Sequence, residues 1–323
     1  MKVLVCGGAG YIGSHTVKSL IQEGYEVVVL DNLSSGRREL LCGGEFILAD
    51  LNDKGAVKGV FQTRKFGAAL HFASLIQVGE SYRDPGKYYA QNLTTGLNLL
   101  DAMLEAGVNK LIFSSSAAVY GVPETVPIPE SHPLNPFNPY GRTKFFFEQI
   151  MKDYEAAYGL KFISLRYFNA AGADPGGSLG EMHDPETHLI PNVLLTVLGK
   201  RTSLELFGDD FPTPDGTAVR DYIHVTDLAG AHVLALKKLL AEPESNFINL
   251  GTNRGYSVLE VIRAVEAVTG RKVAREVKPR RQGDVPVLLA SKEKAERVLG
   301  WTLGHSTLEE IIRTAWEWHK RHA

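Results

Sequence analysis

The chain has few cysteines, no long hydrophobic run and no surplus of charge of either sign. Its two cysteines, Cys6 and Cys42, are too few for a disulfide framework, and neither stands in a paired metal-ligand motif, which favours a reduced compartment. The apolar run at residues 3–6 is too short for a signal peptide, and no stretch approaches the ~18 apolar residues of a membrane helix. We therefore expect a cytoplasmic protein with no membrane partner.

Charge excludes another class of function. The chain has 35 Lys and Arg against 37 Asp and Glu, so its formal net charge is 35 − 37 = −2. A nucleic-acid binder neutralises phosphates with a basic excess, which this chain lacks, so we expect no nucleic-acid partner. A hydrophobic content of 44% and a charged content of 22% are ordinary for a globular protein and exclude global disorder.

Short apolar runs alternate with segments of helical periodicity. Strands are expected at residues 3–6, 27–30, 68–71, 111–114, 162–166 and 247–250. Helices are expected at residues 14–24, 88–106, 140–158, 189–198 and 222–239. Strands that alternate with helices predict an α/β fold with a doubly wound, Rossmann-like parallel sheet.

Glycine is abundant, at 32 of 323 residues, and four glycines gather between the first predicted strand and the first predicted helix. Gly7, Gly8, Gly10 and Gly13 are spaced G-G-x-G-x-x-G, a variant of the common G-x-G-x-x-G. Glycines permit a tight turn and let the backbone approach a pyrophosphate at the positive N-terminus of a helix. The segment predicts a dinucleotide site, although a tight turn without a ligand is the alternative.

Asp31 ends the second predicted strand, 18 residues after Gly13. A carboxylate at this place accepts hydrogen bonds from an adenosine ribose and repels a 2′-phosphate, which favours NAD over NADP. Arg37 and Arg38 are a counter-signal, because a nearby arginine can accept that phosphate. We favour the alternative that both arginines lie in a solvated loop or helix start.

The composition shifts after Asn169, since residues 170–186 are rich in Gly, Pro and Asp and are expected to form a loop. We place a boundary near residue 170. Residues 1–170 are expected to form an NAD-binding domain, with a returning segment at about 218–250. Residues 171–323 are expected to form mainly a smaller C-terminal α/β substrate-binding domain.

A serine, a tyrosine and a lysine form a candidate catalytic group. Tyr140 and Lys144 stand at i and i+4 on one predicted helix and therefore share a face. A free tyrosine has a pKa of ~10, but a nearby ammonium or an oxidised nicotinamide favours the phenolate. Tyr140 can then exchange a proton with a sugar hydroxyl, while Ser116, after a predicted strand, bonds the reacting oxygen. Each residue taken alone has an ordinary structural alternative.

Together these motifs resemble the extended short-chain dehydrogenase/reductase family and, within it, the UDP-glucose 4-epimerases. The glycine turn and the Tyr-x-x-x-Lys pair are typical of the broad family, whereas the segments at 166–169, 219–225 and 279–284 are specific to nucleotide-sugar epimerases. The matching segments cover residues 7–15, 31–33, 71–73, 114–121, 140–144, 166–169, 219–225 and 279–284.

The resemblance implies bound NAD, a UDP-sugar substrate, no metal and a homodimer. It implies catalytic roles for Tyr140, Lys144 and Ser116. The positions that match the cofactor site are Gly7, Gly10, Tyr11, Ile12, Gly13, Asp31, Asn32, Ser34, Ser35, Gly36, Asp50, Leu51, Phe72, Ala73, Asn92, Tyr140, Lys144 and Phe168. The positions that match the substrate site are Ser116, Tyr140, Asn169, His188, Phe207, Arg220, Arg281, Asp284 and Leu288.

Three positions depart from the pattern of the resembled family. Ile76 stands where some members carry a lysine near the cofactor, and His188 stands where some carry an asparagine against the substrate. A neutral imidazole still donates one hydrogen bond, but its charge varies near pH ~6.5. Leu288 falls at the position that sets pocket size beside the sugar, between the bulky tyrosine and the small residue of other members.

The activity implied by the resemblance is NAD-dependent epimerisation at C4 of UDP-glucose and UDP-galactose through a 4-keto intermediate. The alternatives are epimerisation of UDP-N-acetylglucosamine or UDP-glucuronate, dehydration or decarboxylation on the same scaffold, and a non-catalytic NAD-binding module. Ala117 and Ala118 follow Ser116, with no carboxylate before Glu124, which argues against a dehydratase.

Overall fold

The computed structural model describes residues 1–281 and 283–322. Its main element is a seven-stranded sheet in the order β10-β6-β5-β4-β1-β2-β3, in which all neighbouring strands are parallel. These strands are β1 (Lys2–Cys6), β2 (Glu26–Asp31), β3 (Glu45–Leu48), β4 (Ala68–His71), β5 (Lys110–Ser116), β6 (Lys161–Tyr167) and β10 (Asn246–Leu250). The sheet confirms the predicted doubly wound α/β fold.

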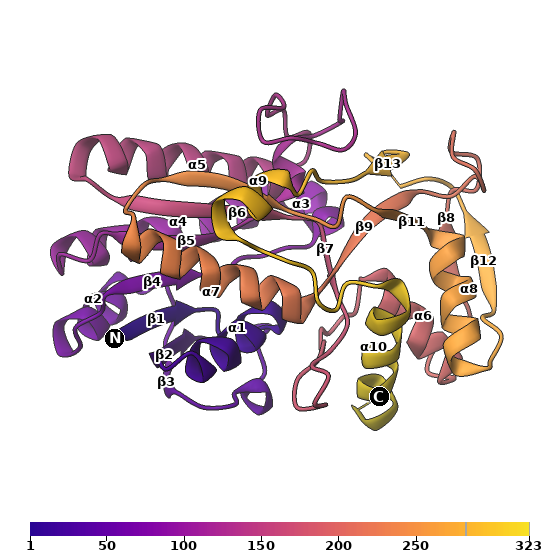
Figure 1. Ribbon diagram of the computed structural model, residues 1–323, viewed down its shortest axis with the longest axis horizontal. Helices are drawn as coiled ribbons and strands as arrows, with labels where there is room; N and C mark the ends of the chain where they lie inside the picture. The colour runs from indigo at the N-terminus through magenta and orange to yellow at the C-terminus, as the bar shows by residue number, and fades with distance from the viewer. Residues whose placement is uncertain (282, 323) are drawn as a thin grey trace.

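Helices cover both faces of this sheet, so its strands are apolar on both sides. Successive residues of a strand point to opposite faces, and β1 shows this directly. Val3 and Val5 belong to one hydrophobic cluster, whereas Leu4 and Cys6 belong to the other. The first cluster includes residues of α1 (Tyr11–Gln22) and α7 (Val225–Ala241), and the second includes residues of α2 (Lys54–Thr63), α4 (Pro85–Glu105) and α5 (Pro139–Tyr158) (Figure 1).

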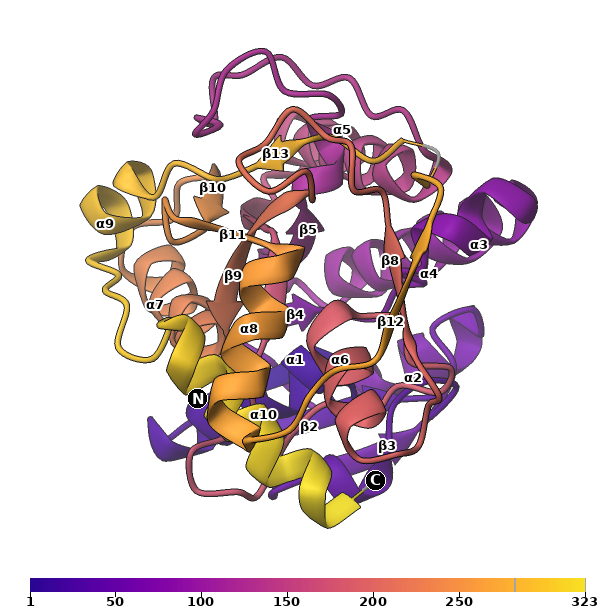
Figure 2. The ribbon, with the colours of Figure 1, turned by 90° about the vertical axis from the view of Figure 1, so that its right-hand side faces the viewer.

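A smaller α/β part contains most of the C-terminal half (Figure 2). It has a four-stranded sheet around β9 and a two-stranded parallel sheet. A third hydrophobic cluster, separate from the two on the main sheet, lies in this part, mainly between α6, α8 and α10. Its elements are β7 (Asn169–Ala171), α6 (Leu189–Val197), β8 (Leu204–Phe207), β9 (Val219–His224), β11 (Gly255–Ser257), α8 (Val258–Thr269), β12 (Arg275–Lys278), β13 (Val287–Leu288) and α10 (Leu308–His322).

Short elements complete the fold. These are η1 (Arg38–Leu40), α3 (Val78–Arg83), η2 (Ala117–Val119) and α9 (Glu293–Leu299), the last of which packs against β10 and α7. Across the described ranges, no helix is both long enough and apolar enough to cross a membrane.

Two predicted segments are wrong in part. Residues 222–224 were expected in a helix but lie in β9, and α7 begins only at Val225 because the His224 side chain caps it by accepting from the Thr226 N–H. Residues 170–171 were expected in a loop but pair with β9 as part of β7. In both places long-range pairing overrides local sequence preference. Within the segment 218–250, β10 pairs with β6 in the main sheet and α7 packs against that sheet, whereas β9 belongs to the smaller sheet.

Candidate active site

One large cavity, with a volume of about 1060 Å³, opens at the carboxyl ends of the main-sheet strands. Its wall includes Gly7 after β1, Phe72 after β4 and Asn169 after β6. Ligands of doubly wound sheets bind at this edge. All of the residues predicted for catalysis, for the cofactor and for the substrate line this cavity. Which of these side chains touches a ligand stays a prediction.

The glycine turn has no room for side chains at two positions. A Cβ on Gly7, whose φ is +79°, would lie 2.5 Å from the Ala73 nitrogen. A Cβ on Gly13 would lie 2.2 Å from the Gly7 oxygen. The N-cap of α1 is Gly10, which makes no side-chain capping bond, and the first turn of α1 contains no acidic residue. The helix therefore presents uncapped N–H groups to the cavity, as pyrophosphate binding requires.

Asp31 braces this turn from the end of β2. Its carboxylate accepts from the Ala9 N–H at 2.9 Å and from the Leu33 N–H at 2.8 Å. Burial raises the pKa of Asp31, and these two hydrogen bonds oppose the rise. The arginines of the counter-signal have other partners, because Arg37 lies 4.0 Å from the Asp184 carboxylate and Arg38 lies over the Phe46 ring. The turn and the acid together fit the pyrophosphate and ribose of NAD.

Helix α5 carries the tyrosine and the lysine in its first two turns. Asn138 starts the helix by accepting from the Gly141 N–H at 2.7 Å, and Pro139 supplies the fixed φ that suits a first position. A Cβ on Gly141 would lie 2.5 Å from the Ala118 oxygen, so glycine allows α5 to approach η2, which directly follows β5. Lys144 Nζ then donates to the Ser114 carbonyl at 2.8 Å.

Burial dominates the electrostatics of these side chains. It lowers the pKa of Lys144 to about 7, against the opposing effect of Glu148, and it raises the pKa of Tyr140. The Ser116 hydroxyl lowers the pKa of Tyr140 through a hydrogen bond, but the net direction is upward. Lys144 was expected to lower the pKa of Tyr140, but in the structure the net shift of this pKa is upward. The physical reason is that the buried ammonium lies 5.9 Å from the Tyr140 ring centre and bonds to a carbonyl.

A buried ion pair connects α5, the helix that carries Tyr140 and Lys144, to the main sheet. Arg166 of β6 donates to both carboxylate oxygens of Glu148 of α5, at 2.9 and 2.6 Å. Ser115 and Ser164 donate to the same carboxylate at 2.7 and 2.8 Å. The network joins β5, β6 and α5. Residue pattern alone did not identify Glu148, since a helical glutamate is ordinarily exposed.

The substrate positions come together from distant parts of the chain. Arg220 of β9 approaches the Asp284 carboxylate at 3.4 Å, and Arg281 approaches its other oxygen at 3.1 Å. The Arg281 guanidinium also lies 4.9 Å from the centre of the Phe207 ring. Two cations, one of which lies over an aromatic ring, match a diphosphate joined to a base. Within the matched segment 279–284, Gln282 lies outside the described residues.

Leu288 and Asn169 lie beside this group. Leu288 of β13 pairs with Arg220 of β9, and the Asn169 amide donates to the Asp221 carbonyl at 2.8 Å. Ile76 also lines the cavity and is 42% exposed, so it offers an apolar surface where the resembled family can place a lysine.

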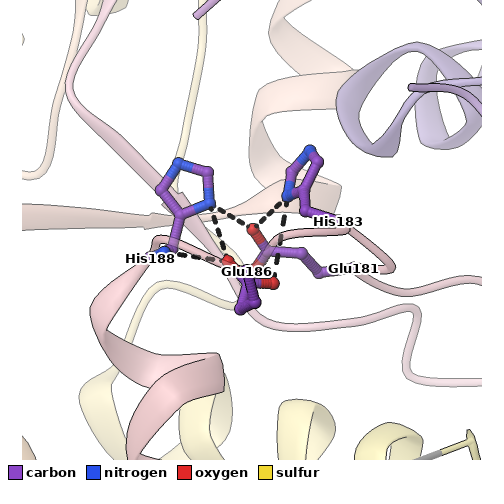
Figure 3. A group of neighbouring side chains, drawn as sticks. All are labelled: Glu181, His183, Glu186 and His188. Carbon is purple, nitrogen blue, oxygen red and sulfur yellow. Dashed lines mark hydrogen bonds and ion pairs between the residues drawn. The ribbon is translucent and has the colours of Figure 1, made fainter. Parts of the chain in front are cut away.

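The loop before α6 brings four titratable side chains together (Figure 3). One oxygen of Glu181 lies 2.9 Å from Nδ1 of His183 and 2.5 Å from Nδ1 of His188. The Glu186 carboxylate lies 3.5 Å from the same His188 nitrogen. Of these residues only His188 was predicted as a site residue. The spacing E-x-H-x-x-E-x-H was the available signal for the other three.

Comparison with known proteins assigns the chain to a family. Residues 3–251 match the NAD dependent epimerase/dehydratase family. The UDP-glucose 4-epimerase of Lacticaseibacillus casei is 49% identical over 323 residues, which cover 100% of this chain and 98% of that protein.

Two solved structures are also similar along nearly their whole length. The UDP-glucose 4-epimerase of Brucella ovis in complex with NAD is 48% identical, with a TM-score of 0.95 and coverage of 98% of this chain and 97% of that one. The UDP-Glc/GlcNAc 4-epimerase of Campylobacter jejuni is 43% identical, with a TM-score of 0.87 and coverage of 99% of both chains. The protein therefore belongs to the NAD dependent epimerase/dehydratase family.

Proposed function

We propose that this protein interconverts UDP-glucose and UDP-galactose by inverting C4 of the hexose. The observation that carries the proposal is the meeting of the glycine turn, the Ser116–Tyr140–Lys144 group and the arginine pair in one cavity. The full-length similarity to the epimerase of Lacticaseibacillus casei supports the same reaction.

The glycine turn, the start of α1 and Asp31 would hold NAD, the cofactor of this family. When bound, NAD supplies a hydride acceptor that returns the hydride and ends unchanged. Tyr140 removes the proton from the sugar 4-hydroxyl and later gives it back. Ser116 hydrogen-bonds the reacting oxygen. Lys144 Nζ donates to the Ser114 carbonyl beside Tyr140 and would contribute to the cofactor site, whereas the charge of a bound oxidised nicotinamide would favour the Tyr140 phenolate.

Inversion requires the 4-keto sugar to turn over without leaving. Arg220, Arg281 and Phe207 hold the UDP part, which does not react, while the sugar rotates and presents its other face. Binding energy from this remote part of the substrate retains the reactive intermediate. Asp284, which lies between the two arginines, can accept from a ribose hydroxyl once they contact the diphosphate.

Replacing Tyr140 with phenylalanine tests the reaction directly. The Tyr140→Phe variant should lose turnover and keep its NAD, because the change removes one oxygen from a ring that remains packed. Conversion of UDP-glucose to UDP-galactose and the NAD content of the purified protein are the two measurements. Near-normal turnover would show that Tyr140 does not transfer the proton of the 4-hydroxyl.

The range of sugars depends on the space beside Leu288, which is intermediate in size. The similarity to a Campylobacter jejuni enzyme named for both UDP-Glc and GlcNAc keeps UDP-N-acetylglucosamine as the second candidate substrate. Offering UDP-glucose, UDP-N-acetylglucosamine and UDP-glucuronate in parallel, with the products separated by chromatography, decides among them. A 4-keto-6-deoxy product would instead identify a dehydratase, and binding of NAD and UDP without conversion would identify a non-catalytic module.

We also propose a cytoplasmic homodimer in which α4 and α5 form the interface. Leu97, Leu104 and Phe146 on these helices are 37%, 43% and 41% exposed. Light scattering after size-exclusion chromatography should give twice the monomer mass.

We further propose residues 1–170, with the returning segment at about 218–250, as the NAD-binding domain and residues 171–323 as mainly the UDP-sugar domain.

A further inference from the structure

The histidines and glutamates before α6 are divided between the cavity wall and the interior. His183 and His188 line the cavity, and the His188 side chain is 43% exposed. The Glu181 and Glu186 side chains are only 3% and 5% exposed. Both Nδ1 atoms face the carboxylates, and the second nitrogen of each ring points away from them (Figure 3). The exposed side of the His188 ring is therefore free to meet a ligand.

The distances describe a hydrogen-bonded network. The Nδ1–Oε1 separations of 2.9 and 2.5 Å are hydrogen-bond lengths. Two ligands of a tetrahedral zinc ion would lie roughly 3.3 Å apart, given metal–nitrogen bonds of ~2.0 Å. Each Nδ1 therefore acts as a donor to Glu181, and each Nε2 remains available on the other side of the ring.

Buried carboxylates favour the charged form of the imidazole that they contact. Burial alone would lower the pKa of His188 and raise that of Glu181, but their mutual contact outweighs burial, so Glu181 and Glu186 raise the pKa of His188 and the histidines lower the pKa of Glu181. The backbone N–H groups of Thr187 and His188 donate to Glu186 at 2.7 and 2.8 Å and fix its position. A cationic His188 then has an N–H on both sides of its ring.

Other titratable groups pack near this network without replacing its charges. Tyr11 of α1 lies with its ring centre 6.2 Å from that of His183 and donates to the Gly172 carbonyl. His319 of α10 is buried, and burial lowers its pKa. Trp318 of α10 donates to the Glu181 carbonyl at 3.0 Å and holds the backbone at this glutamate.

His188 also occupies the N-cap of α6, a nine-residue helix with no acidic residue in its first turn. The start of this helix favours an anion, and the same cavity contains Arg220 and Arg281. We propose that Glu181 is a positioning residue that holds His188 as a permanent cation, so that His188 Nε2 donates to the substrate diphosphate alongside the two arginines. This inference rests on the proposed function for its ligand.

The test compares KM and kcat for UDP-glucose from pH 6.0 to 9.0 in the wild-type holoenzyme, Glu181→Gln, His188→Gln and the double variant. The wild-type KM should vary little, because His188 stays charged. His188→Gln should raise KM about tenfold at all pH values, since a charge-assisted hydrogen bond is lost. Glu181→Gln should have a near-normal KM at pH 6.0 that rises about tenfold by pH 9.0. Because Glu186 remains in this variant, the pH at which KM begins to rise should lie above ~6.5, the pKa of an ordinary histidine.

A matched control separates this effect from a general loss of packing. Glu310 lies 2.7 Å from Nδ1 of His305 in another histidine–carboxylate pair, and neither residue is among those lining the cavity. Glu310→Gln should leave the pH profile of KM unchanged. The double variant should behave like His188→Gln and show no inflection. ¹⁵N shifts of His188 should show a doubly protonated ring at pH 8 in the wild type.

The outcomes separate the two proposals. An equal rise in KM at every pH for Glu181→Gln, or a neutral His188 in the wild type at pH 8, would overturn the role of Glu181 while epimerisation persisted. A wild-type protein that converts no UDP-sugar would instead overturn the proposed function, whatever the charge of His188.

Discussion

The buried Glu148–Arg166 pair permits a quantitative prediction about stability. Both side chains are almost completely buried, at 0% and 3% exposure, and the carboxylate receives four hydrogen bonds, two of them from the guanidinium. Glu148→Gln keeps the shape but removes the charge and places an amide N–H against the guanidinium. Arg166 is then left as a buried cation without a counter-charge. Removing one partner of such a pair costs about 3–5 kcal/mol.

The cost converts into a shift of the melting temperature. An unfolding entropy of about 2.1 cal/mol/K per residue, taken over 323 residues, amounts to ~0.7 kcal/mol per degree. The variant should therefore melt about 4–7 °C below the wild type in scanning calorimetry, with a parallel fall in the urea midpoint.

The control removes a carboxylate from an exposed pair. Glu45 bonds Arg64 at 2.5 Å with its side chain 45% exposed, and Glu45→Gln should change stability by no more than about 1 kcal/mol. If the Glu148→Gln variant had the same melting temperature as the Glu45→Gln variant, burial would not make the Glu148–Arg166 network costly to break.

Three further predictions concern the cofactor turn and the catalytic helix. Asp31→Asn should weaken NAD binding about tenfold, measured by fluorescence titration, because ribose loses a charged acceptor and the Ala9 N–H loses its carboxylate partner. Gly141→Ala should lower kcat at least roughly tenfold with NAD retained, because its Cβ would meet the Ala118 oxygen at 2.5 Å and displace Tyr140; unchanged kcat would contradict the close approach of α5. Lys144 has a pKa of about 7 in the folded protein against 10.5 ordinarily, so unfolding takes up a proton between these values and stability of the NAD-free protein rises with pH across that window. The urea midpoint should therefore rise more from pH 7 to pH 9 in the wild type than in Lys144→Met, and equal rises would mean that the ammonium stays charged when buried.

Much of the cofactor half could be predicted because its signals are local. Strand 68–71 and helices 140–158 and 189–198 were expected within one or two residues of their observed bounds, since buried apolar runs and helical periods lie in continuous sequence. The glycine turn was predictable for the same reason, because a tight backbone turn selects glycine directly. The 222–224 segment was not predictable, since its pairing with β7 involves residues more than fifty positions away.

The local sequence and the tertiary structure determine different properties of this protein. The order of residues determined the alternation of strands and helices, the glycine turn and the shared face of Tyr140 and Lys144, because each depends on neighbours within a few positions. Only the tertiary structure decided the environment of these groups, including the raised pKa of Tyr140, the Glu148–Arg166 pair and the meeting of Arg220 with Asp284 across 64 positions. The physical reason is that charge and pKa follow burial and long-range contacts, which a local pattern does not contain.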